Sequence, residues 1–358
     1  MTDGLVVLWV LFRPGQVLAV ARANMVVLSW GVLACVSAMW SLTPGPSAYF
    51  GLQLLFTILA GLMLATFTSR LHLIQMVFLA LVAAQIISLF IEFAMPGLRS
   101  GFPGGGAFTH KNILGNVMTL QLITSGCLFL AGWRRWLTAG AFVLAAALLI
   151  YSQSASALLT ALAIVGVLLP AGAIYRLSPR SALIGVSIAL IGGALALFVL
   201  PQMDFTPVKF VLESLGKDTT LTGRTDLWQF AKDAIRDHPW LGHGYRGYWE
   251  SEETSKYLLR YVAQQDLWFF HNNYLEVAVA FGLGGPVLLV FGLAIAFWRR
   301  FVEFLSGASM MALWALLFIV YVAALAMAEN PLFENHGLMQ VIFVIAAAAR
   351  DAPNWRPR

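Results

Sequence analysis

Charged residues are scarce in this chain of 358 residues, and their scarcity argues against a soluble protein. Asp, Glu, Lys and Arg make up 11% of the sequence and apolar residues 60%, against about 25% and 45–50% in soluble globular domains. A single water-facing core cannot bury so much apolar surface. The surplus requires lipid, so we predict an integral membrane protein.

The motifs of several common enzyme classes are missing as well. The sequence has no Asp-x-Asp, His-Glu-x-x-His or Cys-x-x-Cys motif, no Walker A motif and no Gly-x-Ser-x-Gly elbow. Its two cysteines, Cys35 and Cys127, fall in apolar runs, where a thiol packs as a small hydrophobe. We therefore expect no metal, no cofactor, no nucleotide hydrolysis and no serine-hydrolase triad.

Basic residues exceed acidic ones, which gives a formal net charge of +5. They are scattered, mostly at the ends of apolar runs, and form no basic stripe that could follow a phosphate backbone. We therefore expect membrane lipid, and no nucleic acid, as a partner.

Long apolar runs predict the fold class. A helix of roughly 20 apolar residues crosses the hydrocarbon layer of a membrane, and ten runs of suitable length are present. We therefore predict an all-α fold, a polytopic transmembrane helical bundle of about ten spans with one large helical loop. The predicted spans are Met25–Ser41, Tyr49–Thr68, Leu73–Met95, Asn112–Gly132, Trp136–Tyr151, Ala157–Tyr175, Ala182–Leu200, Asn272–Trp298, Ala308–Ala328 and Gly337–Ala349.

The distribution of arginine predicts the orientation. If the first span starts in the cytoplasm, 12 of the 17 arginines fall on the cytoplasmic side, as the positive-inside rule requires. The chain then divides into an N-terminal bundle of about seven spans (1–200), a loop outside the cytoplasm (201–271), and about three C-terminal spans with a cytoplasmic tail (272–358). Both termini are expected in the cytoplasm.

The outer loop contains an amphipathic pattern. From Thr225 to Asp237, the apolar residues fall on one face of a helix, and Pro239 stops it before the turn that begins at Leu241. We predict a helix here and a second short helix from Glu252 to Tyr261.

Four polar groups lie near the predicted outer face of the membrane, where charge is costly and suggests function. The first is His110, Lys111 and Asn112, which follow a glycine-rich stretch and open a helix. Helix N-terminal amides with a lysine can receive a phosphate. A flexible turn with a snorkelling lysine and a capping asparagine explains the same residues equally well.

The second group lies in the loop. Arg224 and Arg246 offer guanidinium groups that suit phosphate oxygens, while Trp228, Tyr245 and Trp249 offer aromatic faces for sugars. Arg236 and His238, also in this region, are more simply explained as complements to the dipole of the predicted helix.

The remaining two groups follow the loop and precede the last span. His271 and Glu276 lie about one and a half helical turns apart, and a histidine there can act as a base or simply cap a helix. A polar outer turn of similar ambiguity follows later in the chain, formed by Glu329, Asn330, Glu334, Asn335 and His336.

Five stretches together resemble one family. The sequence from Ser37 to Pro44 is Ser-Ala-Met-Trp-Ser-Leu-Thr-Pro, and from Gly106 to Gly115 it contains Thr-His-Lys-Asn. The other three are Gly223–Trp228, Pro239–Gly244 and His271–Tyr274 running on to Gly282. In these stretches the chain resembles the O-antigen ligase and bacterial polysaccharide polymerase superfamily, in particular its exopolysaccharide polymerases.

The resemblance implies a GT-C-like membrane bundle with a long periplasmic loop before the last helices. It also implies metal-independent transfer of glycan from undecaprenyl diphosphate. The essential loop arginine of the family corresponds to Arg224, and its histidine, separated by ten residues from a glycine, corresponds to His271 with Gly282. Ligases tend to have leucine four residues after the arginine, where this chain has Trp228, and the Thr-His-Lys-Asn run favours polymerases.

The resulting hypothesis is a glycan polymerase of the bacterial inner membrane with a periplasmic active site. An acceptor hydroxyl attacks the anomeric carbon of a donor glycan, and undecaprenyl diphosphate leaves. The expected partners are the undecaprenyl-diphosphate-linked oligosaccharide, membrane lipid and other polysaccharide assembly proteins. The candidate catalytic residues are His271 and Arg224, and the candidate substrate-binding residues are Arg246, Lys111, His110, Asn112, Trp228, Tyr245, Trp249 and Glu276.

Three alternatives remain open from the sequence. A ligase would move the glycan to lipid A core by the same chemistry. A transporter or flippase of lipid-linked sugars would line its midplane with charge, whereas Glu92 and Glu276 both fall near outer ends of predicted spans. A non-catalytic scaffold would not need the polar loop.

Overall fold

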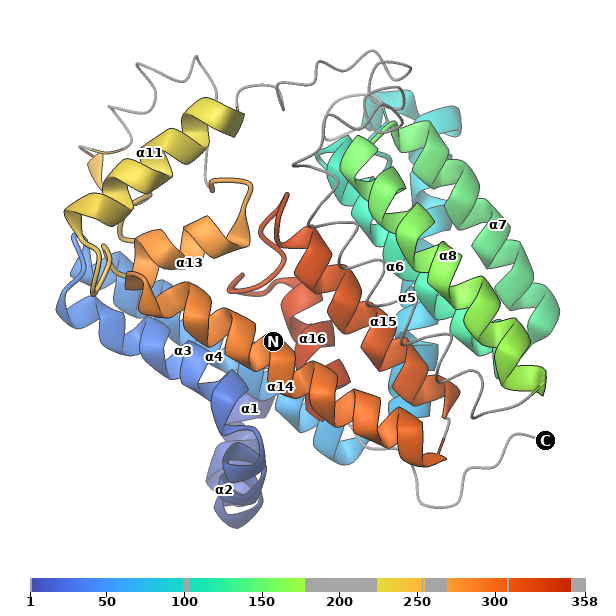
Figure 1. Ribbon diagram of the computed structural model, residues 1–358, viewed down its shortest axis with the longest axis horizontal. Helices are drawn as coiled ribbons and strands as arrows, with labels where there is room; N and C mark the ends of the chain where they lie inside the picture. The colour runs from blue at the N-terminus through green and yellow to red at the C-terminus, as the bar shows by residue number, and fades with distance from the viewer. Residues whose placement is uncertain are drawn as a thin grey trace. The chain divides into compact units, whose positions relative to one another are not determined.

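The computed structural model describes residues 2–98, 104–177, 224–252, 254, 269–307 and 309–348 (Figure 1). At 2–3, 167–177, 224–226 and 307 only the backbone is described. Within these ranges the regular elements are helices and none is a strand. The prediction of an all-α fold is confirmed.

The chain divides into two compact units that interleave along the sequence. The first comprises Met1–Ser69, Thr220–Trp298 and Val322–Arg350, and the second comprises Arg70–Thr219, Arg299–Tyr321 and Asp351–Arg358. The helices of the first unit are α1 (Thr2–Phe12), α2 (Pro14–Ala23), α3 (Met25–Val36), α4 (Pro44–Phe67), α11 (Arg224–Asp237), α13 (Asn273–Phe281) and α16 (Leu338–Ala348).

The second unit contains the middle of the chain. Its described helices include α5 (Arg70–Leu89), a π-helical turn (Phe90–Ala94), α6 (Lys111–Leu130), α7 (Arg135–Ser152) and α8 (Ala155–Leu177). Among the described residues, α14 (Gly284–Gly307) and α15 (Met310–Leu325) each contribute to both units.

Several of these helices suit a membrane. Among the described residues, four are long and apolar enough to span a bilayer: Pro44–Phe67, Arg70–Ala94, Lys111–Leu130 and Arg135–Ser152. The pair Gly4–Phe12 and Pro14–Ala23, bent by 104°, would make a fifth if it counts as one span. The predicted span Ala182–Leu200 and most of the predicted helix Glu252–Tyr261 lie outside the described residues. The total of about ten spans stays a prediction.

One predicted span is wrong in its form. The run Asn272–Trp298 is not one helix: α13 ends at Phe281 and α14 begins at Gly284. Gly282 between them has φ +69°, and a Cβ there would lie 2.5 Å from the carbonyl carbon and oxygen of Trp240. The chain breaks because the loop after α11 presses against this point, a contact that hydropathy cannot reveal.

Candidate functional site

Helix α11 fixes the described part of the loop. Its apolar face packs Leu227, Ala231 and Ala234 into a buried cluster with Phe270 and Val279. Figure 1 shows α11 and α13 lying side by side. The predicted amphipathic helix is confirmed, although it starts at Arg224 itself and not after it.

His271 lies directly before α13, in the left-handed backbone region at φ 53°. Asn272 caps the helix, because its side-chain oxygen accepts the amides of Tyr274 and Leu275. The next backbone amide, that of Asn273, donates to the carbonyl of Ala326, 2.8 Å away. A non-glycine residue in this conformation is strained, and such strain gathers at functional sites.

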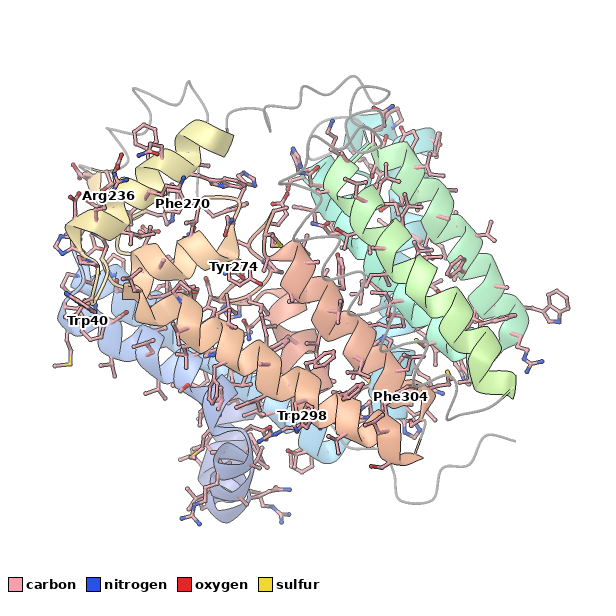
Figure 2. The ribbon with its side chains drawn as sticks, in the orientation of Figure 1. Trp40, Arg236, Phe270, Tyr274, Trp298 and Phe304 are labelled. Carbon is pink, nitrogen blue, oxygen red and sulfur yellow. The ribbon has the colours of Figure 1, made fainter. Side chains whose placement is uncertain are left out.

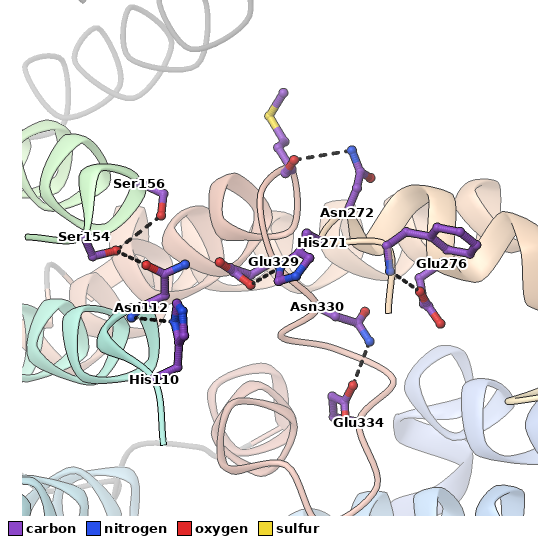
Figure 3. Close-up of polar contacts among 12 residues, drawn as sticks. His110, Asn112, Ser154, Ser156, His271, Asn272, Glu276, Glu329, Asn330 and Glu334 are labelled. Carbon is purple, nitrogen blue, oxygen red and sulfur yellow. Dashed lines mark hydrogen bonds and ion pairs between the residues drawn. The ribbon is translucent and has the colours of Figure 1, made fainter. Parts of the chain in front are cut away.

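The His271 ring pairs with a carboxylate. Its Nδ1 lies 3.0 Å from Oε2 of Glu329, with side-chain exposures of 27% and 12% (Figure 3). Because a carboxylate accepts, Nδ1 carries the proton in this pair, which leaves Nε2 as the ring nitrogen that can accept one from a substrate. A histidine oriented by a carboxylate is the usual arrangement of a general base.

The carboxylate of Glu276, which the sequence predicts to bind substrate, accepts two hydrogen bonds from the protein. Its Oε1 accepts the indole N–H of Trp249 at 2.7 Å, and its Oε2 accepts the amide of Phe270 at 3.0 Å. These bonds fix the chain one residue before His271. The geometry favours a supporting role for this carboxylate.

The three aromatic residues expected at a sugar cleft are engaged in packing. The indole of Trp228 donates to the carbonyl of Phe270 at 3.0 Å. Tyr245 is 4% exposed, and its hydroxyl donates to the carbonyl of Phe333 at 2.5 Å. Trp249 is buried against Phe270, with ring centroids 4.6 Å apart. Their geometry favours a structural role over direct contact with a sugar.

Arg246 carries positive charge into the same unit. Its guanidinium lies over the ring of Phe50, 5.2 Å from the centroid, and 3.9 Å from Glu250. Burial raises the pKa of the Glu334 carboxyl, and the charge of Arg246 and a hydrogen bond from Asn330 oppose that rise. Arg246 therefore acts on the field around the polar turn that follows α15.

That turn also contacts α4. Asn335 donates to the side chain of Gln53 at 2.7 Å, and the backbone amide of His336 donates to the hydroxyl of Thr57 at 2.9 Å. Figure 3 shows Asn330 and Glu334 paired within the turn. The sequence singled out this turn but gave no reason to pair Glu329 with His271. Their pairing is the main contact that sequence reasoning missed.

His110, Lys111 and Asn112 belong to the other unit. Nδ1 of His110 accepts the amide of Asn112 at 3.1 Å and so caps α6. The hydroxyl of Ser154 donates to Asn112 at 3.1 Å (Figure 3). His110, and not Asn112, therefore caps α6. The hydrogen bond from Ser154, which directly precedes α8, to Asn112 was not predicted.

A buried carboxylate holds the glycine-rich loop that precedes α6. Glu92, in the π-helical turn, accepts the amides of Gly104 at 3.1 Å and Gly106 at 2.8 Å, and the hydroxyl of Tyr151 at 3.0 Å. A π-turn in a helix is frequent at functional sites. These hydrogen bonds hold the described part of the loop, which begins at Gly104.

Seven of the ten predicted site residues lie in the first unit: His271, Arg224, Arg246, Trp228, Tyr245, Trp249 and Glu276. Three others lie in the second unit, and the side chain of Arg224 lies outside the described side chains. Among the residues described, none form a group of three or more His, Cys, Asp or Glu side chains suited to a metal.

These features define an all-helical membrane protein with a polar cluster at the ends of its helices. Comparison with known proteins gives its relatives. A family model described as O-Antigen ligase matches residues 140–290. The exopolysaccharide production protein ExoQ of Rhizobium meliloti is 32% identical over 289 residues, which cover 78% of this chain and 66% of the relative.

A second relative, an uncharacterized protein of Haemophilus influenzae, is 35% identical over 86 residues, 22% of this chain and 20% of the relative. The chain thus spans less than the full length of both relatives. It belongs to the O-antigen ligase and polysaccharide polymerase superfamily.

Proposed function

We propose that the chain is an exopolysaccharide polymerase that transfers glycan from an undecaprenyl-diphosphate-linked donor to a sugar hydroxyl, at the periplasmic face of the bacterial inner membrane. The name of the R. meliloti relative supports exopolysaccharide as the product. The structural observation that carries the proposal is the pair of His271 and Glu329, because it leaves one ring nitrogen ready to accept a proton.

The proposed transfer needs no reactant besides the donor and the acceptor. Nε2 of His271 takes the proton from the acceptor hydroxyl while the oxygen attacks the anomeric carbon of the donor. The bond between that carbon and the diphosphate oxygen breaks, and undecaprenyl diphosphate leaves with the electron pair. Glu329 stabilises the imidazolium that forms. Attack opposite the leaving group inverts the anomeric centre.

Cations must stabilise the charge that grows on the diphosphate. We assign this role to Arg224 together with Arg246, since guanidinium groups suit phosphate oxygens. Replacing Arg224 by alanine should abolish polymer in a producing cell while the protein level stays normal. Arg236→Ala is the matched control, because Arg236 lies on the same helix with a side chain 69% exposed. Unchanged polymer length in Arg224→Ala would remove Arg224 from the mechanism.

The second candidate is an O-antigen ligase that transfers glycan to lipid A core, favoured by the description of the matching family model. Both candidates use the same donor and differ in the acceptor. Purified protein supplied with lipid-linked repeat units alone should yield a ladder of longer glycans if it is a polymerase. Product that forms only after lipid A core is added would identify a ligase, and no product with either acceptor would contradict both.

A further inference from the structure

Large apolar side chains are exposed where the loop after α11 meets the end of α3 and the starts of α4 and α14. Trp240 is 81% exposed and Leu241 55%, next to the turn between α3 and α4, where Met39 is 85% and Leu42 48% exposed. Leu283, directly before α14, is 52% exposed. We call these five residues the apolar wedge. None of them is charged, and in water they would form an unfavourable patch.

Three hydrogen bonds hold the apolar wedge in place. The indole of Trp40 donates to the carbonyl of Leu241 at 2.7 Å, and the amide of Leu42 donates to the carbonyl of His243 at 3.1 Å. On the other side, the amide of Leu283 donates to the carbonyl of Pro239 at 2.8 Å. Figure 2 labels Trp40 at the end of α3. These bonds fix the exposed side chains to the ends of α3 and α14.

The wedge is also continuous with the exposed apolar surface of a candidate membrane span. The turn that carries Met39 and Leu42 leads directly into α4, whose span begins at Pro44. Exposed apolar residues continue along the helices, at Tyr49 (61%) and Leu52 (49%) of α4 and at Val287 (69%) of α14. The wedge therefore lies at the level where a spanning helix leaves the hydrocarbon.

Tryptophan has a particular preference for that level. Its ring is amphipathic and gathers where acyl chains meet headgroups, on both sides of a membrane. A Trp with aliphatic neighbours fits such a boundary better than it fits water. A protein partner could bind an apolar patch that is separate from the span of α4, so the continuity of the wedge with that span favours lipid.

We propose that the apolar wedge inserts into the bilayer leaflet that the α3–α4 turn reaches, and that phospholipid is its occupant. This contact anchors the turn after α11 at the lipid–water boundary and so sets the height of Arg246 and His271 relative to a lipid-carried substrate. The contact does not depend on which glycan is transferred or on whether transfer occurs.

Spin labels in lipid nanodiscs test the contact. In a full-length chain with Cys35 and Cys127 replaced by alanine, labels are attached after Trp240→Cys, Asp233→Cys or Leu52→Cys. Asp233 on α11 is the aqueous reference, with a side chain 51% exposed, and Leu52 on the candidate span α4 is the lipid reference. Leu241→Cys repeats the test with Trp240 in place.

The label at 240 should be relaxed more by oxygen, which dissolves in lipid, than by a water-soluble nickel complex, as at 52 and opposite to 233. A label at 240 that behaves like the one at 233, or that is shielded from both reagents by protein, overturns the proposal.

A second measurement keeps the native cysteines. Phospholipid brominated near its carbonyl groups should quench tryptophan fluorescence of the unmodified protein more strongly than that of Trp240→Phe. Equal fractional quenching of the two proteins would also overturn the proposal.

Discussion

Replacing Glu329 by glutamine removes the negative charge beside His271 and keeps the size of the side chain. The contact is 3.0 Å long and the glutamate side chain is 12% exposed, so it is a charge-assisted hydrogen bond in partly dry surroundings. Such bonds contribute about 1.5–3 kcal/mol. Since about 1.4 kcal/mol corresponds to a tenfold change, we expect kcat to fall by about 10- to 150-fold.

The same substitution should leave the donor KM nearly unchanged, because Glu329 acts through His271. Rates of glycan lengthening with purified protein and a defined lipid-linked repeat unit give both constants. His271→Ala should cost about 100- to 10,000-fold, the usual contribution of a general base. Asp233→Asn, an exposed carboxylate on α11, is the control and should stay within about twofold. If Glu329→Gln matches that control, the carboxylate does not orient the base.

Three further predictions concern a glycine and two buried polar side chains. Gly282→Ala should lower the free energy of unfolding by about 1–3 kcal/mol, since its φ is positive and a Cβ would clash. Gly284→Ala should leave the free energy of unfolding unchanged, because a Cβ there meets open space. Thermal unfolding of the two variants in detergent gives the comparison. Burial lowers the pKa of His243, so the unfolded chain binds a proton below about pH 6.5 while the folded chain resists it. Stability should therefore fall as the pH drops through 6.5, less steeply in His243→Gln, and equal slopes would contradict this. Glu92→Ala removes the acceptor of the Gly104 and Gly106 amides and should lower the free energy of unfolding by about 1–3 kcal/mol for each amide. Tyr151→Phe removes a single hydrogen bond to Glu92 and should lower it less. Equal losses in the two variants would mean that Glu92 does not hold the loop.

Local patterns predicted several of the helices that the structure describes. The helix of Thr225–Asp237 follows from residues close in sequence, and its apolar face packs as expected. The starts of α6 and α7 also lie within a residue of the predicted spans. These features depend on periodicity and hydropathy, which a single sequence carries.

Contacts between residues far apart in the chain could not be predicted from the sequence. The pairing of His271 with Glu329 joins residues 58 positions apart, and nothing in either local stretch specifies the other. The break at Gly282 depends on the backbone of Trp240, and the roles of Tyr245 and Trp249 depend on burial that a polar loop does not suggest. Chemistry-bearing residue types could be found from sequence, but their partners could not.

Glycosyl transfer with His271 as the base yields two products that one reaction can follow. Purified protein is incubated with an undecaprenyl-diphosphate-linked repeat unit, and released undecaprenyl diphosphate is measured together with glycan length. We expect one lipid diphosphate to be released for each repeat unit added, and both products to be lost in His271→Ala. Lengthening that His271→Ala sustains at the wild-type rate, or no lengthening by the unmodified protein, would contradict it.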